Sequence, residues 1–185
     1  MKGRAVQTTA PAGAIITTAE AKTHLRVDHS NDDDYIDDLV AAATAIFERE
    51  TYRQLYTATW KYYLDDFQDV IYLPYGEVQS VVTVQYYDTD GNQQTVTNTD
   101  YDVAIEGSIC RIIAKESWPT TDTDTLHAVE VLYTSGYGVA ADVPADIKAA
   151  LKVIVGDLYN KREDFKIKGG FVDRVIQDYK IYFSD

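Results

Sequence analysis

Several residue types are scarce in this sequence, and each shortage narrows what the protein can be. The single cysteine, Cys110, cannot form an internal disulfide, so nothing indicates an oxidising compartment. With one cysteine and three histidines, the chain also lacks the ligand spacing of a zinc site. Basic residues number 17 against 30 acidic ones, which gives a net charge of −13. This balance argues against wrapping nucleic acid through its phosphates and against binding an anionic membrane surface.

Long apolar runs are missing as well. No stretch of about 18 apolar residues occurs, so the sequence predicts no transmembrane helix. The first residues lack the apolar segment of a secretory signal. The composition is that of a globular chain: 185 residues, of which 45% are hydrophobic and 12% aromatic. This length indicates one domain, or one domain with an insertion.

Two helices are predicted in the first third of the chain. Residues 17–20 (TTAE) have the spacing of a capping box, which predicts a short helix over 18–26. Ser30 or Asn31 is expected to cap a longer helix that ends near Arg53, because the aspartates that follow suit the positive end of the helix dipole. The apolar residues of this longer helix recur every three or four positions, which predicts one buried stripe. They are Ile36, Leu39, Val40, Ala43, Ile46 and Phe47.

Residues 56–142 change to a β pattern rich in Tyr, Val, Ile and Thr. Asp90-Gly91 and Glu106-Gly107 are hairpin-type turn sequences, which favours an antiparallel arrangement. The predicted strands cover residues 57–64, 70–73, 78–87, 101–105, 108–114 and 128–134.

A third helix is predicted after Val143, with Pro144 at its first position and an apolar face that extends to about Lys161. The fold class is therefore α+β: a small helical bundle, made of two N-terminal helices plus one C-terminal helix, with an inserted antiparallel β domain and extended N- and C-terminal arms. The expected division places arms at 1–15 and 166–185, a ring-forming helical core at 16–55 and 143–165, and the β insertion at 56–142.

No catalytic, metal or cofactor site is predicted. The sequence contains neither HExxH, nor a GxSxG elbow, nor a phosphate loop. The acidic run from Asp28 to Asp38 fails as a calcium loop, because its sixth residue is Asp33 rather than glycine and its twelfth is Leu39 rather than glutamate. Surface or capping roles account for the three histidines: His24, His29 and His127. We therefore expect no enzymatic activity and no cofactor.

Short stretches at both ends of the chain occur in a characteristic order. Residues 24–28 (HLRVD) separate the first two helices, residues 143–151 (VPADIKAAL) open the third, and residues 158–163 (LYNKRE) close it. This order and spacing resemble the head–tail connector (adaptor, or head-completion) proteins of tailed bacteriophages. The stretches SWP (117–119) and VEVLYTSGYG (129–138) resemble the longer members of that family, which carry a β insertion.

The resemblance implies a structural virion protein of the neck, between capsid portal and tail, that is made in the bacterial host cytoplasm. Such proteins bind beneath the portal ring after DNA packaging and form a ring, typically a dodecamer. The ring extends the DNA channel and offers a platform to the tail or to its stopper or tail-terminator protein, while DNA passes without sequence-specific binding. The family's C-terminal segment commonly reaches the portal. Carried over, the portal-docking residues would be Arg174, Val175, Ile176, Tyr179, Ile181, Tyr182 and Phe183.

A closed ring of identical subunits requires two different, complementary faces on each subunit. Charge alone suggests one such pairing, between acidic residues of the second helix and basic residues of the third. The residues proposed for it are Asp33, Asp34, Asp37, Lys148, Lys152, Lys161 and Arg162.

Much of the acidity lies elsewhere, since residues 54–143 hold 14 acidic and three basic residues. An alternative to the connector remains at this point: a non-enzymatic binding module whose β domain recognises a protein or a carbohydrate, with the helices as its scaffold. The high tyrosine content, 15 residues, suits protein contacts in either case.

Overall fold

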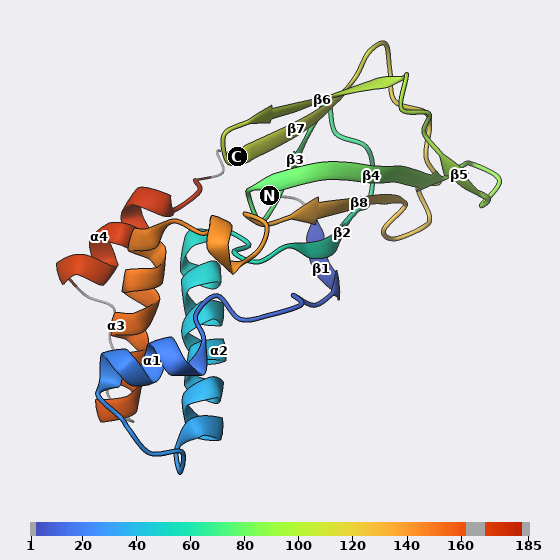
Figure 1. Cartoon of the computed structure of the whole chain (residues 1–185). Helices are drawn as coiled ribbons and strands as arrows, with labels where there is room; N and C mark the ends of the chain where they lie inside the picture. The colour runs from blue at the N-terminus through green and yellow to red at the C-terminus, as the bar shows by residue number, and fades with distance from the viewer. Residues whose placement is uncertain (1–2, 162–168, 183–185) are drawn as a thin grey trace. The chain divides into compact units, whose positions relative to one another are not determined.

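The computed structural model describes residues 3–161 and 169–182, and it confirms the α+β fold class. The chain divides into two compact units (Figure 1). One, here called the helical unit, comprises Pro11–Tyr56 and Tyr137–Lys180. The other, the β unit, comprises Met1–Ala10, Thr57–Gly136 and Ile181–Asp185. None of the described helices is long and apolar enough to cross a membrane.

Four α-helices and one short 3-10 helix are described in the helical unit. They are α1 (Thr18–Leu25), α2 (Asp33–Thr51), η1 (Ala140–Asp142), α3 (Ala145–Lys161) and α4 (Gly170–Tyr179). The predicted apolar stripe of α2 faces the core, where Ile36, Val40, Ala43 and Phe47 are buried. They pack with Ile147, Leu151 and Ile154 of α3 in a single apolar cluster.

The ends of the first two helices follow from local chemistry. The capping box at α1 is confirmed: the Thr17 hydroxyl accepts from the Glu20 amide at 3.2 Å, and the Thr17 amide donates to Glu20 Oε2 at 2.9 Å. The prediction that Ser30 or Asn31 caps α2 is wrong. Asp32 occupies the N-cap position and its side chain makes no capping hydrogen bond. The carbonyl of Ser30 instead accepts from the Asp33 amide, so the turn into α2 is held by backbone.

The C-terminal segment departs from the extended arm that the sequence analysis expects. Residues Gly170–Tyr179 form α4, whose Val175 and Ile176 are buried in the helical core. Val172, Val175, Ile176 and Tyr179 follow the three-and-four spacing of an amphipathic helix. Apolar and charged residues follow one another closely here, a pattern that resembles the alternation of a strand. The helical spacing was therefore not recognised in the sequence.

The β unit contains two antiparallel sheets. The five-stranded sheet has the order β1-β2-β8-β4-β5, and the three-stranded sheet has the order β3-β7-β6. The strands are β1 (Arg4–Thr9), β2 (Ala58–Leu64), β3 (Val70–Leu73), β4 (Val78–Tyr87), β5 (Gln93–Thr95), β6 (Tyr101–Glu106), β7 (Ile109–Ala114) and β8 (Val129–Ser135). Six of the eight were predicted within one or two residues. Strands β1 and β5, both mostly exposed edge strands, were not predicted.

Side chains from both sheets share one core, as in a β-sandwich. Alternate residues of β2 and β8 point inward, among them Trp60, Tyr62, Val131 and Tyr133. Ile71, Cys110 and Ile112 of the three-stranded sheet belong to the same cluster. Burial raises the pKa of the Cys110 thiol to about 11, so this cysteine packs as an apolar residue and not as a reactive thiolate.

Candidate functional site

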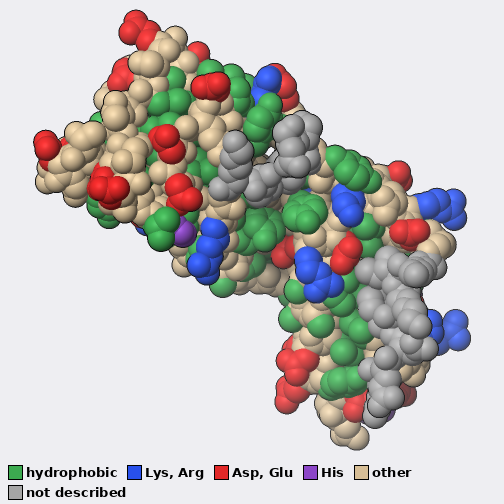
Figure 2. All heavy atoms as spheres, turned by 180° about the vertical axis from the view of Figure 1, so that it is seen from behind, with side chains coloured by type: hydrophobic (Ala, Val, Ile, Leu, Met, Phe, Trp, Pro, Cys, Tyr) green, Lys and Arg blue, Asp and Glu red, His purple; other side chains and the backbone are tan. Residues whose placement is uncertain are grey.

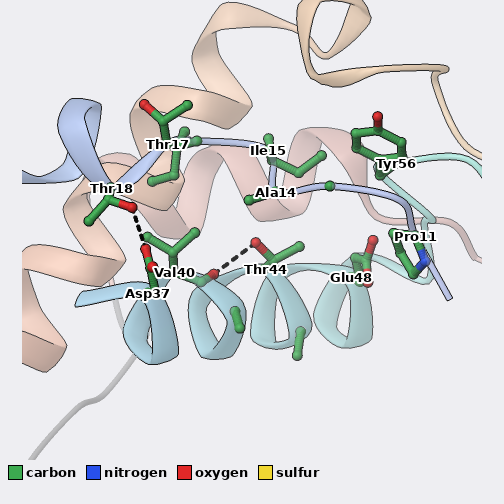
Figure 3. A pocket seen from close by; sticks show the side chains of 14 residues that line it. Pro11, Ala14, Ile15, Thr17, Thr18, Asp37, Val40, Thr44, Glu48 and Tyr56 are labelled. Carbon is green, nitrogen blue, oxygen red and sulfur yellow. Dashed lines mark hydrogen bonds between the residues drawn. The ribbon is translucent and has the colours of Figure 1, made fainter. Parts of the chain in front are cut away.

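A groove along α2 is a concave feature of the helical unit (Figure 3). Its volume is about 610 Å³. One wall is the segment that leads from Pro11 into Thr18, and Tyr56 stands at one end. The floor is α2 itself, which contributes Asp37, Val40, Ala41, Thr44, Ala45 and Glu48.

The floor of the groove is shallow and weakly polar because α2 places short side chains there. Ala41, Thr44 and Ala45 lie on one helical face, and their side chains are short enough to leave the helix backbone close to the surface. The Thr44 hydroxyl donates to the Val40 carbonyl at 2.9 Å, so the one hydroxyl on this floor is already engaged. The groove is thus a smooth, mainly apolar trough.

Carboxylates stand at the two ends of the floor. Asp37 Oδ1 accepts from the Thr18 hydroxyl at 2.5 Å, which ties the entry of α1 to α2 (Figure 3). Glu48 Oε1 accepts from the Leu55 amide and from Gln54 Nε2, both at 2.8 Å. Burial raises the pKa of Glu48 to about 7, and the bond from the Leu55 amide offsets only part of that rise. Asp37 is exposed, whereas Glu48 is half-buried.

The groove has no catalytic constellation among the residues that line it, since it offers carboxylates and hydroxyls but no histidine, cysteine or lysine. Within residues 3–161 and 169–182, no three histidine, cysteine, aspartate or glutamate side chains gather closely enough to hold a metal ion. An open trough with a small-residue floor is suited to another protein surface rather than to turnover of a small substrate.

The residues expected to dock on a portal fall into two groups. Val175 and Ile176 are buried in the helical core, and Tyr179 is half-buried, with its hydroxyl 3.1 Å from Asp146. Ile181, which belongs to the β unit, is buried as well. Arg174 and Tyr182 are exposed, the latter by 68%. Phe183 lies outside the described residues. The structure therefore does not bring these side chains together into one surface.

Three of the seven charged residues expected to join subunits form ion pairs within the chain. Lys22 Nζ lies 2.6 Å from Asp33, and Lys152 Nζ lies 3.3 Å from Glu20. Lys161 pairs with Asp157 one turn earlier on α3, at 2.9 Å. Such pairs hold α1, α2 and α3 together, which leaves less charge for a neighbour than the sequence alone indicates. Asp34 is exposed and Lys148 half-buried, whereas Arg162 lies outside the described residues.

An apolar face on the β unit was not found from the sequence. On the three-stranded sheet, Tyr72, Ile109 and Ile113 are exposed on the side away from the sandwich core. Val103 and Ile105 are exposed along β6, the edge strand. Tyr72, Ile109 and Ile113 stand next to buried residues in their strands, so the pattern predicts strands but not which face stays uncovered. On the face seen in Figure 2, acidic side chains predominate over basic ones on the β unit, at the upper left.

A family model described as "Phage gp6-like head-tail connector protein" matches residues 15–111, which is just over half of the chain. This chain belongs to that connector family. The match begins just before α1 and runs through α2 into β7, so it includes the whole floor of the α2 groove and part of its wall. The connector is accordingly a structural protein of the virion, placed between head and tail, as the resemblance implied.

Solved structures extend the likeness to nearly the whole connector. A chain from the neck of an empty gene transfer agent (GTA) particle, computed with C6 symmetry, is 22% identical; the alignment covers 98% of this chain and 97% of that chain, with a TM-score of 0.83. A chain from the virion of a native GTA particle is also 22% identical, with 97% and 96% covered and a TM-score of 0.83.

A third chain, from the neck of a native GTA particle computed with C12 symmetry, is 21% identical, with 98% and 97% covered and a TM-score of 0.80. At these identities the comparison establishes the fold, including β8, α3 and α4, which the family model does not span. Among curated proteins, no match was found.

Proposed function

We propose that this connector is a head–tail adaptor that docks on the portal ring after DNA packaging and assembles as a ring of twelve subunits. The ring would extend the DNA channel and present a platform to the tail or to its stopper or tail-terminator protein. The observation that carries the proposal is the family match over α1, α2 and the first part of the β unit. The likeness to a neck chain in a structure computed with C12 symmetry supports twelve copies.

The charge of the chain favours passage of DNA over binding. Each subunit carries −13, and twelve copies multiply that charge in one ring. Any share of it that faces the channel repels phosphates over about a Debye length, roughly 8 Å at physiological salt. We therefore expect DNA to cross the ring as cargo, without sequence-specific contacts.

For portal docking, the exposed end of the described chain is the strongest candidate. Tyr182 is exposed and amphipathic, and such residues are enriched at protein interfaces. Val175 and Ile176 contribute differently, because they anchor α4 in the helical core. Removal of residues 171–185 would therefore expose apolar core as well as remove a docking segment, so point variants give the cleaner test.

The test is electron microscopy of the purified connector, alone and mixed with its portal protein. Twelve-fold rings, or twelve-fold density added beneath the portal, are the expected result. Tyr182→Ala should weaken portal binding without a change in circular dichroism, whereas Tyr52→Ala serves as the matched control, since Tyr52 is an exposed tyrosine directly after α2. A connector that ignores the portal at micromolar concentrations would contradict the proposal.

The alternative of a binding module retains one specific observation in its favour, the uncovered apolar face of the three-stranded sheet. Tyr72, Ile109 and Ile113 form a surface that a protein partner could cover. In the adaptor this face would contact a neighbouring neck protein. A stable monomer that binds a soluble ligand through this face, and never the portal, would favour the alternative.

A further inference from the structure

Two features of the helical unit remain unexplained by its own packing. One is the α2 groove, with its floor of short side chains and an exposed carboxylate at Asp37. The other is an exposed corner at the start of α4, formed by Phe171 and Arg174. In Figure 1, α4 lies beside α3, whereas the segment that walls the groove crosses α2. The two features thus belong to different sides of one unit.

The corner on α4 combines an exposed aromatic ring with an exposed cation. Because Val175 and Ile176 face the core, Phe171 and Arg174 face outward, one turn apart on the helix. Phe171 is 45% exposed, which is unusual for so large an apolar side chain. Arg174 Nε reaches the Gly170 carbonyl at 3.5 Å, and no carboxylate among the described residues pairs with its guanidinium.

The groove offers the complement in both shape and charge. Ala41 and Ala45 leave room above α2 for an aromatic ring. Asp37 lies one turn before Ala41, and only its Oδ1 is used, by Thr18. Phe171 and Arg174 are about one helical turn apart on α4. Ala41 and Asp37 are also about one turn apart on α2, so the two spacings match.

We propose that α4 of one subunit docks in the α2 groove of the next, with Phe171 on the Ala41 and Ala45 floor and Arg174 paired with Asp37. This inference rests on the proposed function, since it assigns the contact that closes the adaptor ring. Its occupant is a second copy of this chain, identified by the charge and size complementarity of the two surfaces. Arg174 is thereby assigned to the subunit contact rather than to the portal.

The contact has the symmetry that a ring demands. Groove and corner are different surfaces, so each subunit uses one toward its left neighbour and the other toward its right, which is a heterologous interface.

Disulfide trapping tests the contact in assembled rings. The double variant Ala41→Cys/Phe171→Cys, assembled on the portal and oxidised mildly, should give a ladder of covalent oligomers on a non-reducing gel. The buried Cys110 of the natural sequence does not interfere, because its thiol is both inaccessible and protonated. Ala42→Cys/Phe171→Cys is the matched control: Ala42 is an exposed alanine of α2 that does not line the groove.

A charge exchange tests the same contact without cysteine. Asp37→Arg should lower the yield of rings by about tenfold or more, since it faces Arg174 with a like charge. Adding Arg174→Asp to it should restore assembly to within about twofold of the original chain if the two residues meet. Asp38→Arg, the neighbouring exposed acid, makes the same change in net charge and should leave the yield nearly unchanged.

The outcomes separate this inference from the proposed function. A ladder in the groove variant alone, together with rescue by the exchanged pair, supports the contact. Rings that assemble normally but give no ladder, or that are not rescued, overturn the contact and leave the adaptor intact. A cross-link from Ala41→Cys to the portal itself overturns it too, because the groove then receives another protein. Failure of the unaltered connector to assemble on the portal overturns both.

Discussion

Polar side chains stabilise each of the two units in a different way. In the helical unit they join different elements: Lys22 to Asp33, Lys152 to Glu20, the Tyr159 hydroxyl to Asp32, and the Arg53 guanidinium to the Tyr179 carbonyl. In the β unit some acids bond within their own turns. Asp88 accepts from the amides of Asp90 and Asn92, and Asp122 from the Asp124 amide and the Thr125 hydroxyl.

The difference follows from backbone hydrogen bonding. A helix satisfies its own amides and carbonyls, so it offers its neighbours only side chains. Strands bond to their neighbours through the backbone, and the ladder itself fixes their register. Some acids of the β unit therefore stabilise turns, and bonds from the Asn92 amide and the Thr125 hydroxyl lower the pKa of Asp88 and of Asp122, respectively.

The largest expected effects come from the two cores. Phe47→Ala should destabilise the helical unit by about 3–5 kcal/mol, and Ile112→Ala should destabilise the β unit by about 2–5 kcal/mol, because each removes a fully buried side chain. Hydrogen exchange followed by mass spectrometry should locate each loss. Amides of α1–α3 should exchange faster in Phe47→Ala, and amides of β3, β7 and β8 faster in Ile112→Ala.

Uniform loss of protection across the whole chain in either variant would contradict the division into two units. Val82→Ala is the control, since this large apolar residue of β4 is exposed and its truncation leaves no cavity. It should change the unfolding midpoint by little in urea.

Glu48→Gln should produce the next largest effect, and one that depends on pH. Because the pKa of Glu48 is raised to about 7 in the folded state, the native protein binds a proton that the unfolded chain has lost between about pH 4.5 and pH 7. The free energy of unfolding therefore falls as pH rises through this window. The cost at pH 8 is at most about 3 kcal/mol.

The glutamine variant avoids that cost while its side-chain oxygen still accepts from the Leu55 amide. We expect it to be more stable than the natural chain at pH 8 and about equal at pH 4.5, as measured by urea unfolding across pH. Glu50→Gln is the matched control, because its carboxylate on the same helix is 40% exposed. A Glu48→Gln advantage that stays constant with pH would disprove the assignment.

Tyr133→Phe should cost about 1–2 kcal/mol in the β unit. The Tyr133 hydroxyl donates to the Pro74 carbonyl at 2.8 Å within the sandwich core, and phenylalanine would leave that carbonyl buried without its partner. Tyr179→Phe in the helical unit is the comparison, since its hydroxyl bonds to the exposed Asp146 and water can replace it. Equal losses in thermal unfolding would contradict this ranking.

The smallest effects are expected for ion pairs, whose removal should cost more stability in the helical unit than in the β unit. Lys22→Met should cost up to about 1 kcal/mol, because Lys22 is 19% exposed and its pair with Asp33 joins α1 to α2. Lys115→Met should cost less than about 0.5 kcal/mol, because its pair with Asp102 is longer and the ladder already joins β6 to β7. Salt should reduce the first difference in denaturant titrations; a larger loss in Lys115→Met would reverse the comparison.

Most of the fold could be predicted from periodicity and turn chemistry. The capping box at Thr17 located α1, the apolar stripe located α2, and Pro144 located α3. Strand β1 could not be predicted, because RAVQTT is short and almost wholly exposed, so its only strong contact is the ladder to β2. Helix α4 has the apolar spacing of a helix, but this spacing was interpreted as the alternation of an extended segment.

The candidate site was less accessible to sequence reasoning. The connector family could be predicted from the order of helix breaks, and the family match confirmed it. The groove could not be predicted from the sequence, because it depends on the path that residues 11–17 take across α2. Charge alone also does not reveal that two of the proposed interface residues, Asp33 and Lys152, have partners within their own chain.

The interleaving of the two units affects how the connector is made on the ribosome. The chain leaves the β unit after Ala10, returns at Thr57, leaves again after Gly136 and returns at Ile181. Strand β1 therefore cannot pair until β2 has been synthesised, some fifty residues later. Helix α2 cannot pack until α3 has been synthesised, nearly a hundred residues later. Neither unit can close its core while the first half of the chain emerges, so the usual order of N-terminal before C-terminal folding does not apply. The nascent chain must carry the exposed apolar stripe of α2 until most of the protein has been translated.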